Sequence, residues 1–321
     1  MGKLDILAKE YMRQPVVFAD VFNQFLYHGR QVIEPARLTE LDTAEIAVPY
    51  GTDHASVPEQ RYRDTVKMLM AMTDGTVAYC ILAVENEGKI NYAMPVKDGL
   101  YDFLQLSHQV TSAAKLHRQS ETKDYVPSSD EFLSGFWKSD RLLPVVTVVI
   151  YFGAEEWDGP LSLKEMYTDC DKEILKYVAD YHINLIAPNA LTDHEIDAFQ
   201  TNLREIMRYI KYSKDKQKLN EVVNSENRFK SVERGAMEIM NAATNSNMKF
   251  DEGEERVNVC VAIQGMMEDS KAEGIIEGKI EGSILTCKEL GHSQEDAKNY
   301  VMTKYNKSVH EAEELIKLYW K

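Results

Sequence analysis

The run LLPVVTVVIYFG, residues 142–153, constrains the fold more than any other part of the chain. It is short, apolar and rich in β-branched residues, which is typical of a strand rather than a helix. A half-exposed strand would alternate apolar and polar residues, and this run does not. It therefore predicts a central strand that is covered on both faces, as in the parallel sheets of α/β proteins.

Helical and strand-like patterns alternate around this run. A helical pattern covers residues 16–29 and ends at Gly29, and a longer one covers residues 96–119. Strand-like segments are found at residues 62–72, 76–86 and 181–191. From residue 193 to about residue 248 the pattern is almost entirely helical. The order predicts an α/β fold with a mixed central sheet, flanking helices and a mostly helical second half.

The last 70 residues contain a four-residue repeat, KAEGIIEGKIEGS, with glycines at 274, 278 and 282. Glycine inside a helix costs about 1 kcal/mol relative to alanine. Three glycines at this spacing share one helical face, so another helix backbone could pack closely there. We interpret the repeat as a self-association surface that makes a homo-oligomer; a flexible, weakly helical linker is the alternative.

Two short helices with clear start signals are expected after the repeat. Gly291 is a helix stop, and Ser293 and Ser308 are N-caps. The expected organisation is a main domain over residues 1–250, an acidic linker with the repeat helix over 251–285, and a small helical tail over 286–321.

Charge and composition exclude several classes of protein. A formal net charge of -15 over 321 residues argues against a protein that coats nucleic acid, although a local basic groove stays possible. No apolar run is long enough to span a membrane, and the first residues lack a signal-peptide core. The four cysteines are far apart, which suits a reducing cytoplasm and gives no zinc signature.

Two acids, Glu85 and Glu87, end the strand-like segment at 76–86 and share one face of it. If Asp74 and Gly75 form a tight hairpin turn, Asp64 lies directly opposite Glu85. Facing like charges cost roughly 0.2–1 kcal/mol, and a divalent cation would offset that cost. This convergence predicts a metal-dependent phosphodiester hydrolase, whereas a solvated strand end is the plain alternative.

The sequence also resembles a known family. The segments RYRDTVKML, AYCILAVENEGKINYAMPVKDGLYDFLQ and LPVVTVVIYFGAEEWDGPLSL occur in the order found in the bacterial recombination-promoting nucleases, or putative transposases. That family belongs to the PD-(D/E)XK phosphodiesterase superfamily. The resemblance implies a restriction-endonuclease-like fold and a DNA endonuclease that uses Mg²⁺ or Mn²⁺ in recombination or mobile-element biology.

When the family motif is placed on this sequence, Asp64 matches the metal-binding aspartate. Glu85 matches the first acid of the (D/E)-x-K motif. Glu87 stands where the motif has lysine, or glutamine in many members. Glutamate cannot act there as a cation, so it would be an extra metal ligand or hold a water. Alternatively the site has decayed, and the chain is a DNA-binding or protein-interaction module.

Further candidates lie on the expected helices. Asp20 on the first helix could approach the metal, or it is an ordinary surface acid. Tyr101 and Gln105 could face the site from the helix at 96–119. The stretch RYIKYSKDKQK either contacts a DNA backbone or is a solvated helix face. Its basic residues are Arg208, Lys211, Lys214, Lys216 and Lys218.

Overall fold

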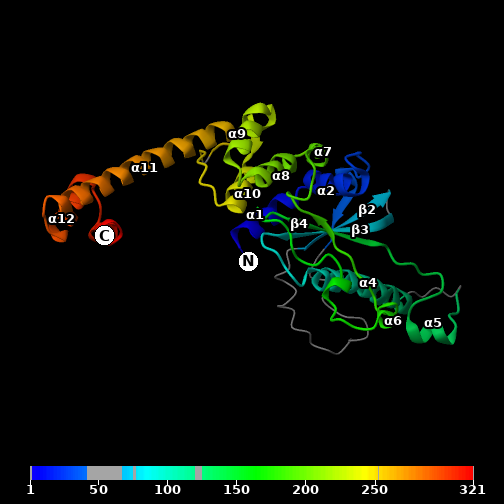
Figure 1. The fold of residues 1–321 in the computed structure, drawn as a ribbon. Helices are drawn as coiled ribbons and strands as arrows, with labels where there is room; N and C mark the ends of the chain where they lie inside the picture. The colour runs from blue at the N-terminus through cyan, green and yellow to red at the C-terminus, as the bar shows by residue number, and fades with distance from the viewer. Residues whose placement is uncertain (1, 42–66, 75–76, 120–124, 252, 321) are drawn as a thin grey trace. The chain divides into compact units, whose positions relative to one another are not determined.

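The computed structural model describes residues 2–41, 67–74, 77–119, 125–251 and 253–320 (Figure 1). The chain forms two compact units. The first comprises Met1–Ser246 with Gly253–Asn258, and the second comprises Asn247–Glu252 with Val259–Lys321. The first unit combines helices with a sheet, so the predicted mixed α/β class is confirmed.

The sheet of the first unit has the strand order β1-β2-β3-β4-β5. Its strands are β1 (Leu38–Glu40), β2 (Lys67–Asp74), β3 (Val77–Glu87), β4 (Val145–Tyr151) and β5 (Asn184–Ile186). Neighbours from β1 to β3 run antiparallel, whereas β3, β4 and β5 run parallel. The predicted mixed sheet is therefore confirmed, and β4 lies inside it with Val148 and Val149 fully buried, as the apolar run predicted.

The pairing of β2 with β3 differs from the predicted register. Asp74 pairs with Val77, so the turn closes one residue later than expected. The later turn moves the partner of Glu85 by two residues, and an irregularity between Met72 and Thr73 moves it by one more. Lys67, rather than Asp64, is the Cα partner of Glu85, so the predicted Asp64–Glu85 pairing is wrong. Asp64 itself lies outside the described residues.

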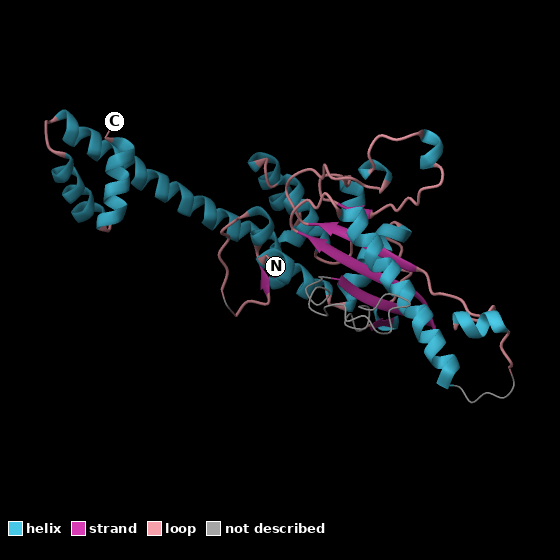
Figure 2. Cartoon of the chain, turned by 90° about the horizontal axis from the view of Figure 1, so that it is seen from below, coloured by secondary structure: helices cyan, strands magenta, loops and turns pink. Residues whose placement is uncertain are grey.

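Helices cover the sheet on both sides. Helix α1 (Lys3–Met12) packs against β3, and in Figure 1 α2 (Pro15–Tyr27) lies above the strands and α4 (Met94–Gln119) below them. Gly29 follows α2 with a φ of +85°, which confirms the predicted helix stop. Figure 2 shows the same sheet in magenta from below, with α4 lying across it.

The second half of this unit is mostly helical, as predicted. Its helices are α5 (Ser129–Ser134), α6 (Lys172–Leu175), α7 (Asp193–Asp197), α8 (Leu203–Tyr212), α9 (Lys216–Ser225) and α10 (Arg234–Thr244). Short 3₁₀ turns occur at Pro35–Arg37, Lys164–Met166 and Asn227–Lys230, and a small ribbon pairs β6 (Val232–Glu233) with β7 (Arg256–Val257). Helix α10 packs against α8 and α1, so the helical part and the sheet part form one unit.

The second unit is built from α11 (Val259–Glu289), α12 (Gln294–Tyr305) and α13 (Val309–Tyr319). Ser293 and Ser308 accept hydrogen bonds from Asp296 and Glu311 backbone N–H groups, which confirms both predicted N-caps. A small apolar core joins the three helices through Ile280, Ile284, Ala297, Val301, Ala312 and Ile316. The repeat lies within α11, which continues without a break past residue 285.

The glycines of the repeat face open space among the described residues of the second unit. A Cβ atom added at Gly274, Gly278 or Gly282 would meet nothing there within 4 Å. Packing within this unit therefore does not explain these glycines, and self-association stays a prediction. Among the described helices, none is long and apolar enough to cross a bilayer.

Candidate functional site

Two acids at the end of β3 meet one lysine of α4. Glu85 and Glu87 point to the same side of the strand because side chains alternate along it. The Lys97 Nζ atom lies 3.3 Å from Glu85 Oε2 and 2.5 Å from Glu87 Oε1. We call these three residues the Glu85 site.

The local sequence brings these residues together. After β3 the chain turns at Asn91, whose side chain accepts a hydrogen bond from the backbone N–H of Ala93. Helix α4 begins at Met94, so Lys97 falls in its first turn, directly beside the strand end. Glu85 is fully buried, whereas the Lys97 side chain is 29% exposed. The acids are thus deep in the site and the ammonium lies between them and solvent.

The two acids hold Lys97 as an ammonium. Burial alone would lower the pKa of Lys97, but the charge of Glu85 and the hydrogen bond and charge of Glu87 raise it above its ordinary value. The ammonium therefore stays charged at neutral pH. Within this group of three, one ammonium is shared by two carboxyl groups.

The donors of the Glu85 site suit a hard divalent cation. Mg²⁺ binds oxygen ligands, often one or two carboxylates together with waters and substrate phosphates. In the part of the chain that the structure describes, no three His, Cys, Asp or Glu side chains are grouped to hold a metal. The described residues thus supply Glu85 and Glu87, while the third predicted carboxylate, Asp64, is outside them.

Lys97 was missed by the sequence reasoning, which looked for a cation only at position 87. The available signal was the spacing of Lys97, Tyr101 and Gln105, which places all three on one face of α4. Tyr101 interacts electrostatically with Lys97, and Gln105 is buried. Lys97 lies on the face of α4 that contacts the acids, and the roles expected for Tyr101 and Gln105 stay predictions.

A second acidic network attaches α4 to the sheet. The Tyr181 hydroxyl lies 2.7 Å from Asp102 Oδ2 and 3.1 Å from Asp98 Oδ2. Thr147 of β4 donates to Asp102 at 2.5 Å. Burial, followed by the two aspartates, raises the pKa of Tyr181, so the phenol stays protonated. This network fixes the helix turn that follows Lys97.

Asp20 does not join the Glu85 site. Its carboxylate accepts hydrogen bonds from the Gln200 and Thr201 backbone N–H groups and from the Thr201 hydroxyl. Burial raises its pKa despite these donors. These contacts hold the segment before α8, so they give Asp20 a structural role and do not support the interpretation as a metal ligand.

The basic stretch is not one continuous surface. Arg208 is 4% exposed and is paired with Asp197 and Glu226, so its interpretation as a DNA contact is wrong. Lys211 donates to the Leu191 carbonyl and to Asp193.

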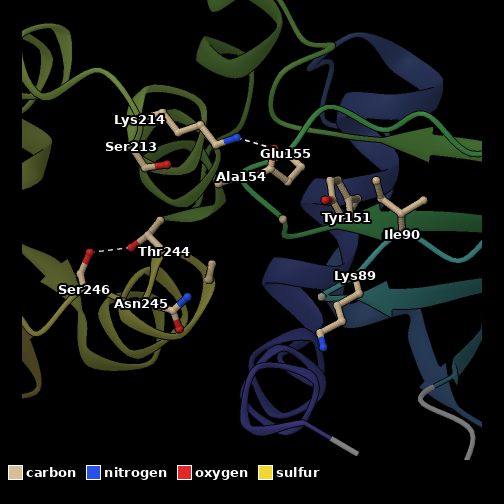
Figure 3. A pocket seen from close by; sticks show the side chains of 13 residues that line it. Lys89, Ile90, Tyr151, Ala154, Glu155, Ser213, Lys214, Thr244, Asn245 and Ser246 are labelled. Atoms are coloured by element: carbon tan, nitrogen blue, oxygen red, sulfur yellow. Dashed lines mark hydrogen bonds and ion pairs between the residues drawn. The ribbon is translucent and has the colours of Figure 1, made fainter.

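The other three lysines of the stretch, Lys214, Lys216 and Lys218, are exposed. Lys214 pairs with Glu155 and lines a cleft (Figure 3). These lysines remain available to an external anion.

Comparison with known proteins supports the resemblance. Residues 104–236 match the family model described as "Putative transposase, YhgA-like". The predicted resemblance to the putative transposase family is thereby confirmed over this segment. The match includes β4 and Tyr181, whereas the Glu85 site precedes it. Searches of curated proteins and of solved structures found no match.

Proposed function

We propose that this protein is a divalent-metal-dependent DNA endonuclease of the PD-(D/E)XK type that acts in the cytoplasm on mobile or recombining DNA. The observation that carries the proposal is the convergence of Glu85 and Glu87 on one ammonium at the end of the sheet's central strands. The match to the putative transposase family supports the mobile-element context.

In this proposal, Glu85 and Glu87 would hold Mg²⁺ or Mn²⁺, and Asp64 would add a carboxylate as the resemblance implies. When bound, the ion stabilises charge on a phosphate and lowers the pKa of a bound water. The donor set fits this role because carboxylate oxygens are the ligands such ions prefer.

Lys97 supplies the positive charge that position 87 lacks. Its raised pKa means that it cannot take up a proton at neutral pH, so it is no general base. It acts instead as a fixed charge that can donate hydrogen bonds to a phosphoryl oxygen as negative charge develops there. Glu87 orients this ammonium through the 2.5 Å contact.

A non-catalytic DNA-binding or interaction module is the second candidate. The observation that favours it is the same ion pair, because a glutamate that replaces the motif lysine and binds Lys97 could also mark a site that no longer turns over. The two candidates differ in whether DNA is cut.

The test is incubation of the purified full-length protein with supercoiled plasmid in Mg²⁺, Mn²⁺ or EDTA, beside Glu85→Ala. We expect nicked or linear DNA with either metal, none in EDTA and none from the variant. Cutting by Glu85→Ala at the parent rate would assign the activity elsewhere. DNA binding by the parent without cutting in any metal would favour the non-catalytic module.

A further inference from the structure

A cleft of about 450 Å³ opens where β3 and β4 end (Figure 3). One wall is formed by the residues that follow β3, from Gly88 to Ile90, and by the end of β4 from Tyr151 to Glu155. The other wall comes from the ends of α8 and α10. In open α/β sheets, ligands bind outside the carboxyl ends of parallel strands, and β3 and β4 are parallel here. The cleft begins one residue beyond Glu87.

Tyr151 places a buried polar group in this cleft. The residue is 2% exposed, and its hydroxyl has no hydrogen bond within the described part of the chain. In Figure 3 the phenol oxygen points into the cleft. The hydroxyl lines the cleft, so it can donate a hydrogen bond to a ligand there, and such a bond to a charged group contributes about 1.5–3 kcal/mol. Burial and the charge of Glu155 raise the pKa of Tyr151, so the hydroxyl is a donor at neutral pH.

Gly153 makes room for this hydroxyl. A Cβ atom at that position would lie 2.1 Å from the Tyr151 hydroxyl oxygen. Any side chain at position 153 would displace the Tyr151 phenol, so the position of the hydroxyl depends on this glycine. Tyr151 is also the Cα partner of Glu87, which puts the cleft next to the Glu85 site.

The charge of the cleft favours an anion. Lys89 and Lys214 line it together with one acid, Glu155, which gives a net charge of +1 in a chain of net charge -15. Lys214 is paired with Glu155, but both side chains are largely exposed, at 58% and 70%. Exposed pairs of this kind contribute about 0–1 kcal/mol, so a phosphate can take the place of the glutamate.

The adjoining hollow is more acidic than the cleft. It adds Glu156, Asp158 and Lys211 to the shared Glu155 and Lys214, which gives three acids and two lysines. The charges therefore favour a phosphate in the cleft over one in this hollow.

We propose that this cleft binds the phosphodiester backbone of the substrate DNA next to the Glu85 site, with Tyr151, Lys89 and Lys214 as the contacting residues and Glu155 as a competing anion. The assignment of DNA as the ligand rests on the proposed function. The cleft itself rests on the geometry and charge described above.

The test is fluorescence anisotropy with fluorescein-labelled duplex DNA, single-stranded DNA and RNA of one sequence, in EDTA and low salt, so that cleavage plays no part. Lys214→Gln and Tyr151→Phe should each weaken binding of DNA about 3- to 10-fold, since tenfold corresponds to about 1.4 kcal/mol. Glu155→Gln should strengthen it about 2- to 5-fold because it releases Lys214 and removes a negative charge.

The chain offers matched controls. Lys176 and Glu173 form another ion pair with nearly the same exposure, 62% and 71%, and neither lines the cleft. Tyr177 is 90% exposed and also lies outside it. Lys176→Gln, Glu173→Gln and Tyr177→Phe should change binding less than about 1.5-fold, as expected for charges and hydroxyls remote from the ligand.

Cleft variants that bind DNA like their controls would overturn the proposal, as would an unaltered chain that binds no DNA. A Lys214→Gln variant that melts earlier but binds normally would also overturn it, because the lysine would then only offset the negative end of α8. Tenfold tighter binding of RNA would overturn DNA as the ligand. The assay needs no metal, so the two proposals can fail separately. If the cleft variants bind DNA more weakly than the parent, but the parent cuts no DNA, the cleft proposal is upheld and the nuclease proposal is contradicted.

Discussion

Two fully buried glutamates of the first unit, Glu85 and Glu205, have different partners. Glu205 accepts from Arg228 Nε at 2.7 Å and from Asn202 Nδ2 at 2.5 Å. Arg228 is itself held by the carbonyl groups of Gln200 and Thr201. Glu85 instead shares the Lys97 ammonium with Glu87.

The partners of the two glutamates separate an acid with a structural role from a candidate catalytic acid. The Arg228 guanidinium is planar and anchored to backbone, so it holds Glu205 in one arrangement. The Lys97 ammonium sits on a flexible stem and is shared by two carboxylates, whose oxygens are the ligands that a divalent cation prefers. Burial is the same in both places; the kind of cation and the way it is anchored differ.

The largest expected effect is a difference in cleavage rate between variants of these two glutamates. Glu85→Gln should reduce plasmid cleavage by about 10³-fold or more, because the charge that holds the metal is lost. Glu205→Gln should keep the specific activity of the folded fraction while destabilising the first unit by about 1–3 kcal/mol. Cleavage rates and thermal melts of both variants check this. Equal rate losses in the two variants would remove the distinction.

Lys97→Met should give the next largest effect. Loss of the ammonium should lower the cleavage rate about 10²-fold or more, as loss of an oriented charge donor does elsewhere. It should also destabilise the fold by about 2–4 kcal/mol, because Glu85 stays buried without this cation.

This destabilisation has a pH dependence that thermal melts can follow. In the parent, the pKa of Lys97 is raised, so its contribution is fully present below its unfolded pKa near 10.4 and is lost only as pH rises through the higher folded value. The Lys97→Met variant lacks this titration, so the difference in stability from the parent should stay constant between pH 5 and pH 9 and shrink only above the unfolded pKa of lysine. A difference that grows on acidification would contradict the ion-pair account, and Lys176→Met provides the exposed-pair control.

Glu87→Gln should have a smaller effect. Glutamine can still accept the hydrogen bond from Lys97, its carbonyl oxygen is still a possible metal ligand, and Glu85 keeps the buried carboxyl group. We expect cleavage to stay within about threefold of the parent or to rise, since the ammonium becomes more available to a phosphate. A loss as large as that of Glu85→Gln would make Glu87 an essential ligand.

The smallest effect is expected on assembly, in the second unit. Met267 and Leu285 are exposed and lie seven residues from Gly274 and Gly278, on the same face of α11. Gly278→Leu should shift sedimentation toward a smaller species if a second copy packs there. Gly265→Leu, also without a neighbour within 4 Å, is the control outside the repeat. Identical sedimentation of the two variants and the parent would show that the repeat is not the association surface.

Local sequence patterns predicted helices and strands because these elements depend on residues that are close together in the sequence. The apolar run gave β4, and Ser293 and Ser308 gave the starts of α12 and α13. The β2–β3 register failed because the turn closes later than the Asp74-Gly75 pair predicts, and because an irregularity at Met72 leaves no local signature in composition.

The site was predicted only in part, for a related reason. Glu85 and Glu87 lie on one strand, so alternation was enough to pair them. Lys97 comes from another element, and Tyr181 reaches Asp98 across 83 residues of sequence. Arg208 looked like a surface cation because its partner Glu226 is also remote in the sequence.

The most direct test of the central claim is Mn²⁺ binding measured by electron paramagnetic resonance of the free ion. The full-length parent and Glu205→Gln are titrated beside Glu85→Gln, without DNA. We predict that the parent and Glu205→Gln bind Mn²⁺ alike, and that Glu85→Gln weakens binding at least tenfold, which corresponds to about 1.4 kcal/mol. Equal binding by all three proteins, or none by the parent, would contradict the assignment of a metal to the Glu85 site.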